Sequence, residues 1–487
     1  MDGTAMLDWL TGQTATGKPE PVLMIPRRNR RPLRWGLAPG ILLGLAVAVS
    51  VTPPAGAQSL EEALATAYSS NPDLLAARAQ LRSVNEGVPQ ALSNWRPQVT
   101  VSGSAGLERR EFQGDSGSDT ETTEPWEVGV GVTQSLYRGG RTTAETARAE
   151  AEVEAQRARL TATEQDVLLD AVVAHMDVWR DQSVLQLTRK NEQVLSRELE
   201  AARDRFTVGE ITRTDVAQSE ARLARATAER IDAEGALASS RAIYQRVIGI
   251  YPGILVQPPD LEGLPAEQKT VVDIALARNP NLASAQFSAR AARHRVREDL
   301  GRFLPEVSLT GDISHSEESV VENGETDQYR ILAQVTIPLY QQGLVSSQVR
   351  EDKQLANQRR LEIDAARRTV EQNAIRAWEA YQTARAQIVS IRAEVAANKI
   401  ALEGVRQEQA VGARTVLDVL DAEQELLDSE VNLVRAHRND VVAGYAELAT
   451  MGRLTAADLK LPVDVYDPAS DYEAIRNKWF GIGIPGE

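Results

Sequence analysis

The longest regular pattern in the sequence is a series of apolar residues spaced alternately four and three positions apart. It runs through Val370, Ala374, Ala377, Tyr381, Ala384, Ile388, Ile391 and Val395, and it resumes at Leu402 and Val405. This is coiled-coil spacing, and its many alanines indicate close approach between helices. The segments 141–208 and 344–411 contain no proline and one glycine between them. A single helix over either would be about 100 Å long, which a globular core cannot enclose.

A second pattern, the alternation of apolar and polar residues, predicts two pairs of β-strands. Val99 and Val101 face one side of the first strand, and Thr100 and Ser102 face the other. The four strands are expected at about 97–108, 126–136, 305–314 and 330–338. Apolar-out, polar-in strands of about ten residues are typical of membrane β-barrels, although a soluble β-sandwich could also show them. The connecting loops 109–125 and 315–328 are polar, which suits an exposed surface.

The sequence after residue 57 consists of two similar halves. Asn71-Pro72 recurs as Asn279-Pro280, 208 residues later. From the strand exits onward the offset is 203, as in the matches of Leu136-Tyr137 with Leu339-Tyr340, of Val208-Gly209 with Val411-Gly412, and of Asp215-Val216 with Asp418-Val419. A single change of offset within one loop region is what a duplication with a shortened loop produces.

These patterns together predict a mainly α fold with a small β part and an internal two-fold repeat. The first repeat is expected at 58–250, with a helical hairpin at 141–250. The second is expected at 270–461, with its hairpin at 344–452. Residues 251–269, rich in proline and glycine, form a linker between the halves, and 462–487 form a tail read as either part of a belt or a disordered extension.

The first 57 residues resemble an export signal with an N-terminal extension. An arginine-rich stretch before residue 35 precedes the apolar run Leu37–Val51, and Ala55-Gly56-Ala57 supplies the small residues that a signal peptidase recognises. A membrane anchor is the alternative, but about 15 apolar residues fall short of the roughly 20 that span a bilayer. We expect cleavage before Gln58, and Met24 is a candidate for the true start.

Composition narrows the possible functions. The chain has no cysteine, which excludes a disulfide framework, a cysteine nucleophile and an acylated N-terminal cysteine. Its formal net charge of −15 argues against a general nucleic-acid-binding surface. The four histidines, at 175, 294, 315 and 437, show no metal-binding spacing, and there is no phosphate-binding Gly-Lys-Ser/Thr loop. We therefore expect no enzyme activity, no cofactor and no metal.

The number of strands predicts an oligomer. Four strands cannot close a barrel, and an open sheet edge is not tolerated in lipid. Two chains would supply eight strands and three would supply twelve. Periodicity alone does not choose between these numbers.

Two segments carry a resemblance to a known family. The stretch Val411-Gly412-Ala413-Arg414-Thr415-Val416-Leu417-Asp418-Val419-Leu420-Asp421-Ala422 resembles the second hairpin tip of the TolC family of outer-membrane efflux proteins, and Phe206–Glu210 with Thr214-Asp215-Val216 resembles the first. The resemblance implies a homotrimer with a long α-helical barrel and a 12-stranded β-barrel in the outer membrane of a Gram-negative bacterium. It also implies that the linker 251–269 contributes to an equatorial belt.

The resemblance further implies a passive exit duct for efflux or type I secretion. Its partners would be outer-membrane lipid, a periplasmic adaptor protein, and an inner-membrane ABC or proton-driven transporter. The main alternative is that the chain is itself a periplasmic adaptor, since adaptors also contain long helical hairpins. The sequence names neither the cargo nor the class of transporter.

The hairpin tips are the candidate functional site. Gly209 and Gly412 lie where the long helices reverse, a position that favours a positive φ, and together with Val208 and Val411 they form the expected adaptor contact. Asp418 and Asp421 lie three residues apart on one helix face and would form two stacked carboxylate rings in a trimer. Such rings select cations and would make a pore constriction. The alternative is that both aspartates merely stabilise a helix N-terminus.

A latch is also predicted at the tips. Arg414 is expected to pair with Asp215 on the adjacent tip and to hold the entrance closed. The sequence departs from the family at Gln409, where members often have tyrosine, so the latch is expected to be weaker or differently built.

Overall fold

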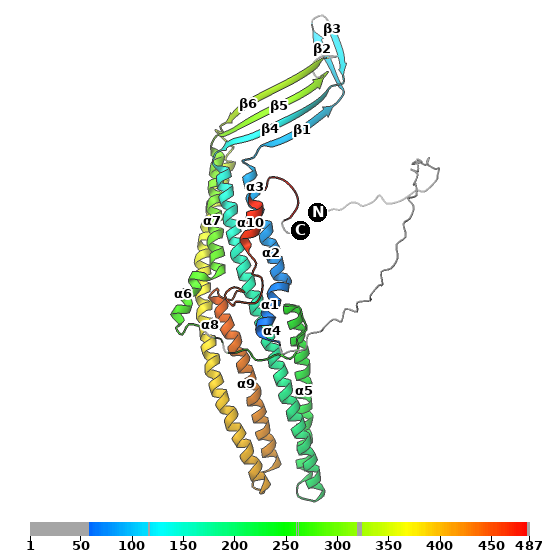
Figure 1. Cartoon of the computed structure of the whole chain (residues 1–487), viewed down its shortest axis with the longest axis vertical. Coiled ribbons are helices and arrows are strands. Elements are labelled where there is room, and N and C mark those ends of the chain that lie inside the picture. The colour runs from blue at the N-terminus through cyan, green and yellow to red at the C-terminus, as the bar shows by residue number, and fades with distance from the viewer. Residues whose placement is uncertain (1–57, 115–116, 260, 262, 319–323, 485–487) are drawn as a thin grey trace, which may run out of the picture. The chain divides into compact units, whose positions relative to one another are not determined.

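The computed structural model describes residues 58–114, 117–259, 261, 263–318 and 324–484. The predicted signal peptide, the predicted cleavage site and the candidate start at Met24 lie outside these residues. In each half, short helices lead into β-strands, and the strands lead into a long helix and a shorter returning helix (Figure 1). Among the described residues, no helix has an apolar stretch long enough to cross a bilayer.

The first half contains five helices and four strands within its described residues. In chain order they are α1 Leu60–Ser70, α2 Pro72–Asn85, α3 Gly87–Ser93, β1 Gln98–Ala105, β2 Glu108–Gly114, β3 Gly117–Thr123, β4 Trp126–Arg138, α4 Arg141–Thr207 and α5 Arg213–Ile248.

The second half has fewer elements, and the tail adds a further helix. They are α6 Gln268–Arg278, α7 Pro280–Leu300, the 3₁₀ turn η1 Gly301–Phe303, β5 Glu306–Glu317, β6 Glu325–Thr336, α8 Leu344–Ala410, α9 Val416–Thr450 and α10 Pro468–Arg476.

The two halves share local structure as well as sequence. Helices α4 and α8 are each 67 residues long. Asn71 and Asn279 cap α2 and α7 with their side-chain oxygens. Their amide groups donate to equivalent carbonyls, Val247 O at 2.8 Å and Thr450 O at 3.1 Å. The duplication therefore extends to contacts between distant parts of the chain.

The long helices are held by apolar seams between neighbours. Helix α4 packs against α5, α7 and α9, and α8 packs against α7 and α9. The predicted seam of α8 is buried at Val370, Ala374, Ala377, Tyr381, Ala384, Ile388, Val395 and Leu402. The largest apolar cluster gathers residues of α1, α4, α5, α6 and the end of α9, including Leu64, Met176 and Tyr244. Stability thus comes from helix–helix packing, as expected for helices of this length.

The two strand pairs join into one antiparallel sheet in the order β1-β4-β5-β6. Register places Val101, Val130, Ile313 and Tyr329 in one row across the sheet. The intervening row on the opposite face runs through Thr100, Gly131, Asp312 and Arg330. The sheet therefore has one apolar face and one polar face, as the alternation predicts.

Both faces of this sheet are exposed in the single chain. Val101 is 73% exposed and Ile331 is 82% exposed. Asp312 and Arg330 form an ion pair of 3.2 Å on the polar face. Within the described residues, β1 and β6 each pair along one edge only. An apolar face without a covering layer needs lipid or another protein against it.

The polar loop expected at 109–125 is a β-hairpin instead. Strands β2 and β3 pair with each other and form a separate two-stranded ribbon beyond β1 and β4. Polar composition led to the loop prediction, but Thr120, Thr122 and Thr123 are β-branched and favour extended backbone. In the second half, β5 and β6 extend to Glu317 and from Glu325, so the connection there is shorter than expected.

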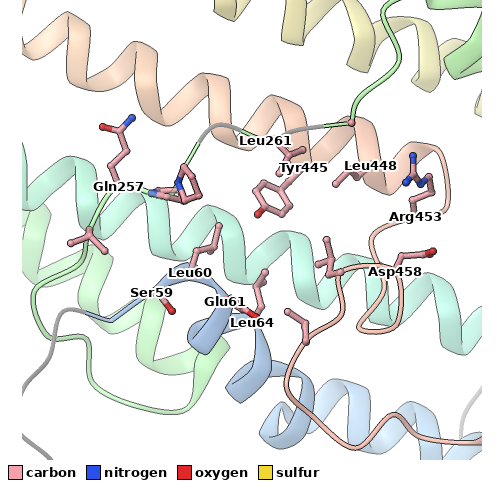
Figure 2. Close-up of a pocket in the computed structure, with 16 residues that line it drawn as sticks. Ser59, Leu60, Glu61, Leu64, Gln257, Leu261, Tyr445, Leu448, Arg453 and Asp458 are labelled. Atoms are coloured by element: carbon pink, nitrogen blue, oxygen red, sulfur yellow. The ribbon is translucent and has the colours of Figure 1, made fainter.

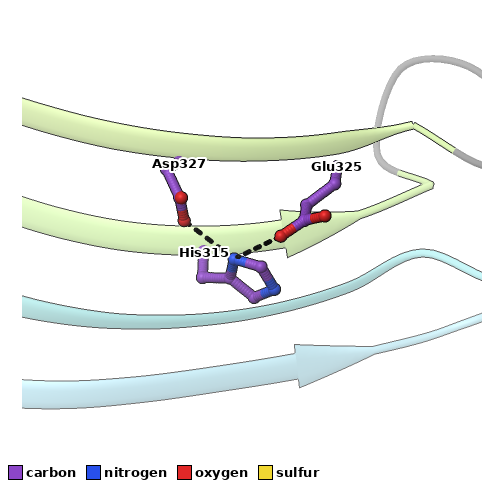
Figure 3. Close-up of side chains that lie close together, drawn as sticks. All are labelled: His315, Glu325 and Asp327. Atoms are coloured by element: carbon purple, nitrogen blue, oxygen red, sulfur yellow. Dashed lines mark hydrogen bonds and ion pairs between the residues drawn. The ribbon is translucent and has the colours of Figure 1, made fainter.

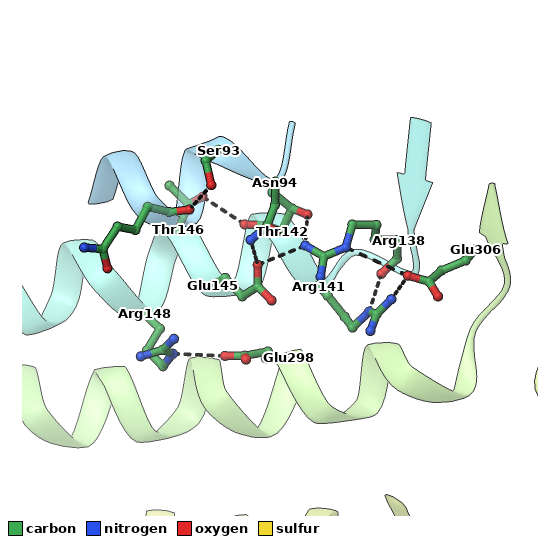
Figure 4. A network of polar contacts seen from close by, with 11 residues as sticks. Ser93, Asn94, Arg138, Arg141, Thr142, Glu145, Thr146, Arg148, Glu298 and Glu306 are labelled. Carbon is green, nitrogen blue, oxygen red and sulfur yellow. Dashed lines mark hydrogen bonds and ion pairs between the residues drawn. The ribbon is translucent and has the colours of Figure 1, made fainter. Parts of the chain in front are cut away.

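A polar network fixes the sheet to the helices (Figure 4). Arg138, at the end of β4, pairs with Glu145 of α4 at 3.3 Å. Arg141 pairs with Glu306 at the start of β5. Asn94, just after α3, donates to Glu145 at 2.7 Å. These bonds join residues from both halves at the point where strands become helices.

The linker crosses the helices beside the N-terminal segment. Gln58 forms a parallel bridge with Leu255. A pocket of about 570 Å³ lies between the start of α1, the linker and the end of α9, and Tyr445 and Arg453 are among its lining residues (Figure 2). The described tail is not simply a disordered extension, because it contains α10, which packs against α2 and α3.

Candidate functional site: the hairpin tips

Each hairpin reverses through the same turn. Gly209 and Gly412 both have φ +81°, in the left-handed region where glycine is favoured. Gly209 N–H donates to Phe206 O at 3.0 Å, and Gly412 N–H donates to Gln409 O at 3.0 Å. The predicted helix reversals therefore lie at these glycines.

A valine precedes each of these glycines and projects from the turn. Val208 is 71% exposed and Val411 is 81% exposed. The two tips thus present matched apolar side chains to solvent.

The helices that leave both tips begin with a capping box. Thr212 and Asp215 form it at α5, and Thr415 and Asp418 form it at α9. The carboxylate of Asp418 accepts from Thr415 N–H at 2.9 Å and from its hydroxyl at 2.8 Å. These hydrogen bonds hold the pKa of Asp418 below its ordinary value. Asp418 therefore has the helix-terminal role weighed as the alternative to a constriction.

Asp421 has a different environment. Its carboxylate pairs with Arg222 of α5, so this contact bridges the first and second hairpins. The Asp421 side chain is 55% exposed, and that of Arg222 is 26% exposed. Helix packing beside the pair supports the bridge, because Leu195, Ala226 and Leu420 form a small buried apolar cluster there.

Within the chain, Arg414 and Asp215 have other partners than each other. Arg414 Nε donates to Glu408 at 2.9 Å, and Asp215 accepts from Thr212 N–H at 2.8 Å. The predicted latch is a contact between tips, so it stays a prediction for neighbouring chains.

Each hairpin also carries an equivalent cross-helix ion pair. Arg203 pairs with Glu220 at 2.8 Å, and Arg406 pairs with Glu423 at 2.6 Å. The spacing of 203 residues relates both members. Glu423 is buried, which raises the pKa of its carboxyl even though Arg406 opposes the shift. These pairs hold the two helices of a hairpin together, whereas Arg222–Asp421 joins one hairpin to the other.

Arg222 was not singled out from the sequence. The one available signal is a break in the repeat, since the position 203 residues later is Glu425 rather than a basic residue. A charge that differs between repeats marks a place where the two hairpins are not interchangeable.

Among the described residues, one cluster could hold a metal ion, and it lies far from the tips. His315 of β5 lies beside Glu325 and Asp327 of β6, with ligand atoms all within 4.8 Å of one another (Figure 3). His315 Nδ1 is 2.8 Å from Asp327 Oδ1. No residue spacing in the sequence indicates this cluster, because cross-strand register brings the three residues together. The side chain of His315 is partly exposed, and those of Glu325 and Asp327 are exposed. Exposed acidic groups often gather in this way without binding an ion.

Comparison with known proteins identifies the family. The family model described as "Outer membrane efflux protein" matches residues 63–249 and 271–451. The chain belongs to this family. It is 36% identical over 449 residues to the outer membrane efflux protein BepC of Brucella suis, covering 91% of this chain and 97% of that protein. It is 26% identical to the outer membrane protein TolC of Vibrio cholerae, covering 83% of this chain and 92% of that protein.

A solved structure shows the same fold. The Campylobacter jejuni CmeC outer membrane channel aligns with a TM-score of 0.73 at 16% identity, covering 86% of this chain and 89% of that one. The protein is therefore an outer-membrane efflux protein of the TolC type, with the mainly helical channel-tunnel fold and two repeats. The family is one of transport channels, and none of these comparisons supports the periplasmic-adaptor alternative.

Proposed function

We propose that three copies of this chain form the exit duct of a tripartite efflux pump or a type I secretion system. The observation that carries the proposal is the four-stranded sheet with one apolar face and two open edges. Strand β1 of one chain would pair with β6 of the next, and three chains would close about twelve strands. Closure removes the edges that lipid does not tolerate.

The polar face of the sheet would then line the pore, and the long hairpins would continue it as a helical tunnel through the periplasm. Three chains are favoured over two because eight strands leave an interior that side chains fill. Asp312, Arg330 and the neighbouring serines and threonines suit a water-filled lumen.

Covalent cross-linking tests the number of chains. The natural chain has no cysteine, so Ser102→Cys on β1 and Gln328→Cys on β6 can be combined without background. With a flexible bis-maleimide, the double variant should give a ladder that ends at a covalent trimer, whereas each single variant should not. A ladder ending at a dimer, or no ladder, would contradict closure by three chains.

The tips are proposed as the gate at the periplasmic end. Asp418 and Asp421 lie in the first two turns of α9, and three copies would place six carboxylates around the axis. Asp421 is the more exposed of the two, although its carboxylate pairs with Arg222 within the chain. We propose that Arg222–Asp421 keeps the two hairpins of a chain together in the closed state, with Arg414–Asp215 acting between neighbouring chains.

The proposed partners at the tips are a periplasmic adaptor and, beyond it, an inner-membrane transporter that supplies the energy. Val208 and Val411 offer exposed apolar contacts in equivalent positions. The double variant Val208→Asp/Val411→Asp should abolish co-purification with the periplasmic adaptor. Val389→Asp is the matched control, because Val389 is 70% exposed on α8 away from the tip. If Val389→Asp reduces co-purification with the adaptor to the same extent, the tips are not the docking site.

A further inference from the structure

The C-terminal segment after α10 ends in a short apolar structure that the duct itself does not use. Trp479 is 65% exposed, Phe480 is 89% exposed, and Ile482 is fully exposed. Ile484 is 55% exposed, and no charged residue lies between Trp479 and Ile484. Four large apolar side chains within six residues are thus turned to solvent. We call residues 478–484 the C-terminal hook.

The hook has a defined backbone. Lys478 N–H donates to Ile475 O at 2.9 Å, which continues the end of α10. Gly481 has φ +102°, in the left-handed region, so the chain turns sharply there. The Lys478 ammonium donates to Gly483 O and closes the turn. The hook is therefore an ordered turn that carries exposed apolar side chains.

The hook contacts the rest of the chain at the base of the sheet, just before β1 begins. Arg96 donates from a guanidinium nitrogen to Lys478 O at 2.7 Å. The same guanidinium lies 4.9 Å from the centre of the Trp479 ring, a cation–π contact. Arg96 is two residues before Gln98, the first residue of β1. Trp479 therefore lies where the strands begin.

Helix α10 fixes this position from below (Figure 1). Ile475 is 3% exposed, and Arg476 pairs with Glu150 of α4 at 3.0 Å. Tyr472 packs on the buried cluster formed by α3 and α4 residues. The hook is therefore held beside the start of β1, by Arg96 before the strand and by the docked helix α10.

From this placement we infer that the C-terminal hook inserts into the periplasmic leaflet of the outer membrane and anchors the channel there. The inference rests on the proposed barrel, because the base of a membrane-spanning sheet lies at the lipid–water interface. Tryptophan and phenylalanine favour that interface, and Lys478 and Arg96 flank the apolar residues with positive charge suited to anionic headgroups.

Site-directed spin labelling tests the inference on the whole mature chain. Gly483→Cys is the reporter, because an added Cβ there meets no atom within 4 Å. Ala474→Cys on the exposed face of α10 is the water reference, and Val101→Cys on the apolar face of the sheet is the lipid reference. Collision with oxygen reports lipid, and collision with a water-soluble nickel chelate reports water. The labelled protein is reconstituted in vesicles of phosphatidylethanolamine and phosphatidylglycerol.

We expect the oxygen-to-nickel ratio at 483 to be at least threefold that at 474 and close to that at 101. In the background Trp479→Ser/Phe480→Ser/Ile482→Ser, the ratio at 483 should fall to the value at 474 while the oligomer and its conductance are unchanged. A ratio at 483 equal to that at 474 in the otherwise natural chain would overturn the anchor. Protection from both reagents would also overturn it, since another protein surface would then cover the hook. A water-like ratio at 101 together with a lipid-like ratio at 483 would refute the barrel but not the membrane contact of the hook.

Discussion

Replacing Arg222 with glutamine removes the cation that pairs with Asp421 and leaves the packing of α5 against α9 in place. The pair is partly exposed, with 26% of the Arg222 side chain and 55% of the Asp421 side chain open to solvent. Ion pairs of this exposure contribute about 0.2–1 kcal/mol. Three copies in a trimer would together favour the closed gate by about 0.6–3 kcal/mol. Their loss should therefore raise the open-to-closed ratio about 3- to 150-fold.

Single-channel recording in planar bilayers measures that ratio directly. Arg222→Gln should lengthen and enlarge the open events and keep cation selectivity, because Asp421 remains charged. Asp421→Asn should also open the channel but weaken selectivity, because it removes the carboxylate. The charge-swapped variant Arg222→Asp/Asp421→Arg should restore closure.

Arg225→Gln is the matched control. Arg225 lies on the same helix and pairs with Glu229 within α5, so its loss breaks an exposed ion pair without separating the hairpins. If Arg222→Gln and Arg225→Gln behave alike, or if both match the natural channel, the Arg222–Asp421 pair does not hold the gate.

Two further predictions concern stability and are checked by thermal unfolding followed by circular dichroism. Burial raises the pKa of Glu447 from 4.5 to about 7, so the free energy of unfolding falls as pH rises from 4.5 to about 7. Burial lowers the pKa of His175 from 6.5 to about 4, so the free energy of unfolding falls as pH drops from 6.5 to about 4. Each shift corresponds to about 3 kcal/mol, and the two opposing slopes should nearly cancel between pH 4.5 and 6.5. Glu447→Gln should therefore gain stability as pH rises from 4 to 6.5, and His175→Phe should lose it from 4.5 to 7; flat profiles in both variants would contradict the assigned directions. At the strand-to-helix joint, Gly139→Ala should cost about 2–4 kcal/mol because its Cβ would overlap Gly301 O. Gly140→Ala should cost only about 1 kcal/mol, since Gly140 also has positive φ but open space around it; equal losses would remove the overlap as the cause.

The parts of the fold that local sequence determines were predictable. A threonine three residues before an aspartate, after a glycine turn, is the capping box seen at Thr415 and Asp418. The four-and-three spacing in α8 identified the buried seam, and strict alternation identified the two faces of the sheet.

The parts that depend on packing between distant segments were not predictable. Arg222 meets Asp421 only because α5 and α9 come together, and no local pattern marks that contact. The β2–β3 ribbon was hidden by its polar composition, which resembles that of a loop. The tail showed no periodicity long enough to reveal that α10 docks on α2 and α3.

Conductance of a chain of residues 58–487, which begins at the predicted cleavage site, tests the central claim most directly. The purified oligomer in planar bilayers should give small, cation-selective steps, and Asp418→Ala/Asp421→Ala should enlarge them and reduce their selectivity. If the double variant leaves the conductance and selectivity of the steps unchanged, the constriction does not lie at these aspartates. No steps at all from a correctly folded, membrane-extracted oligomer would contradict the export duct.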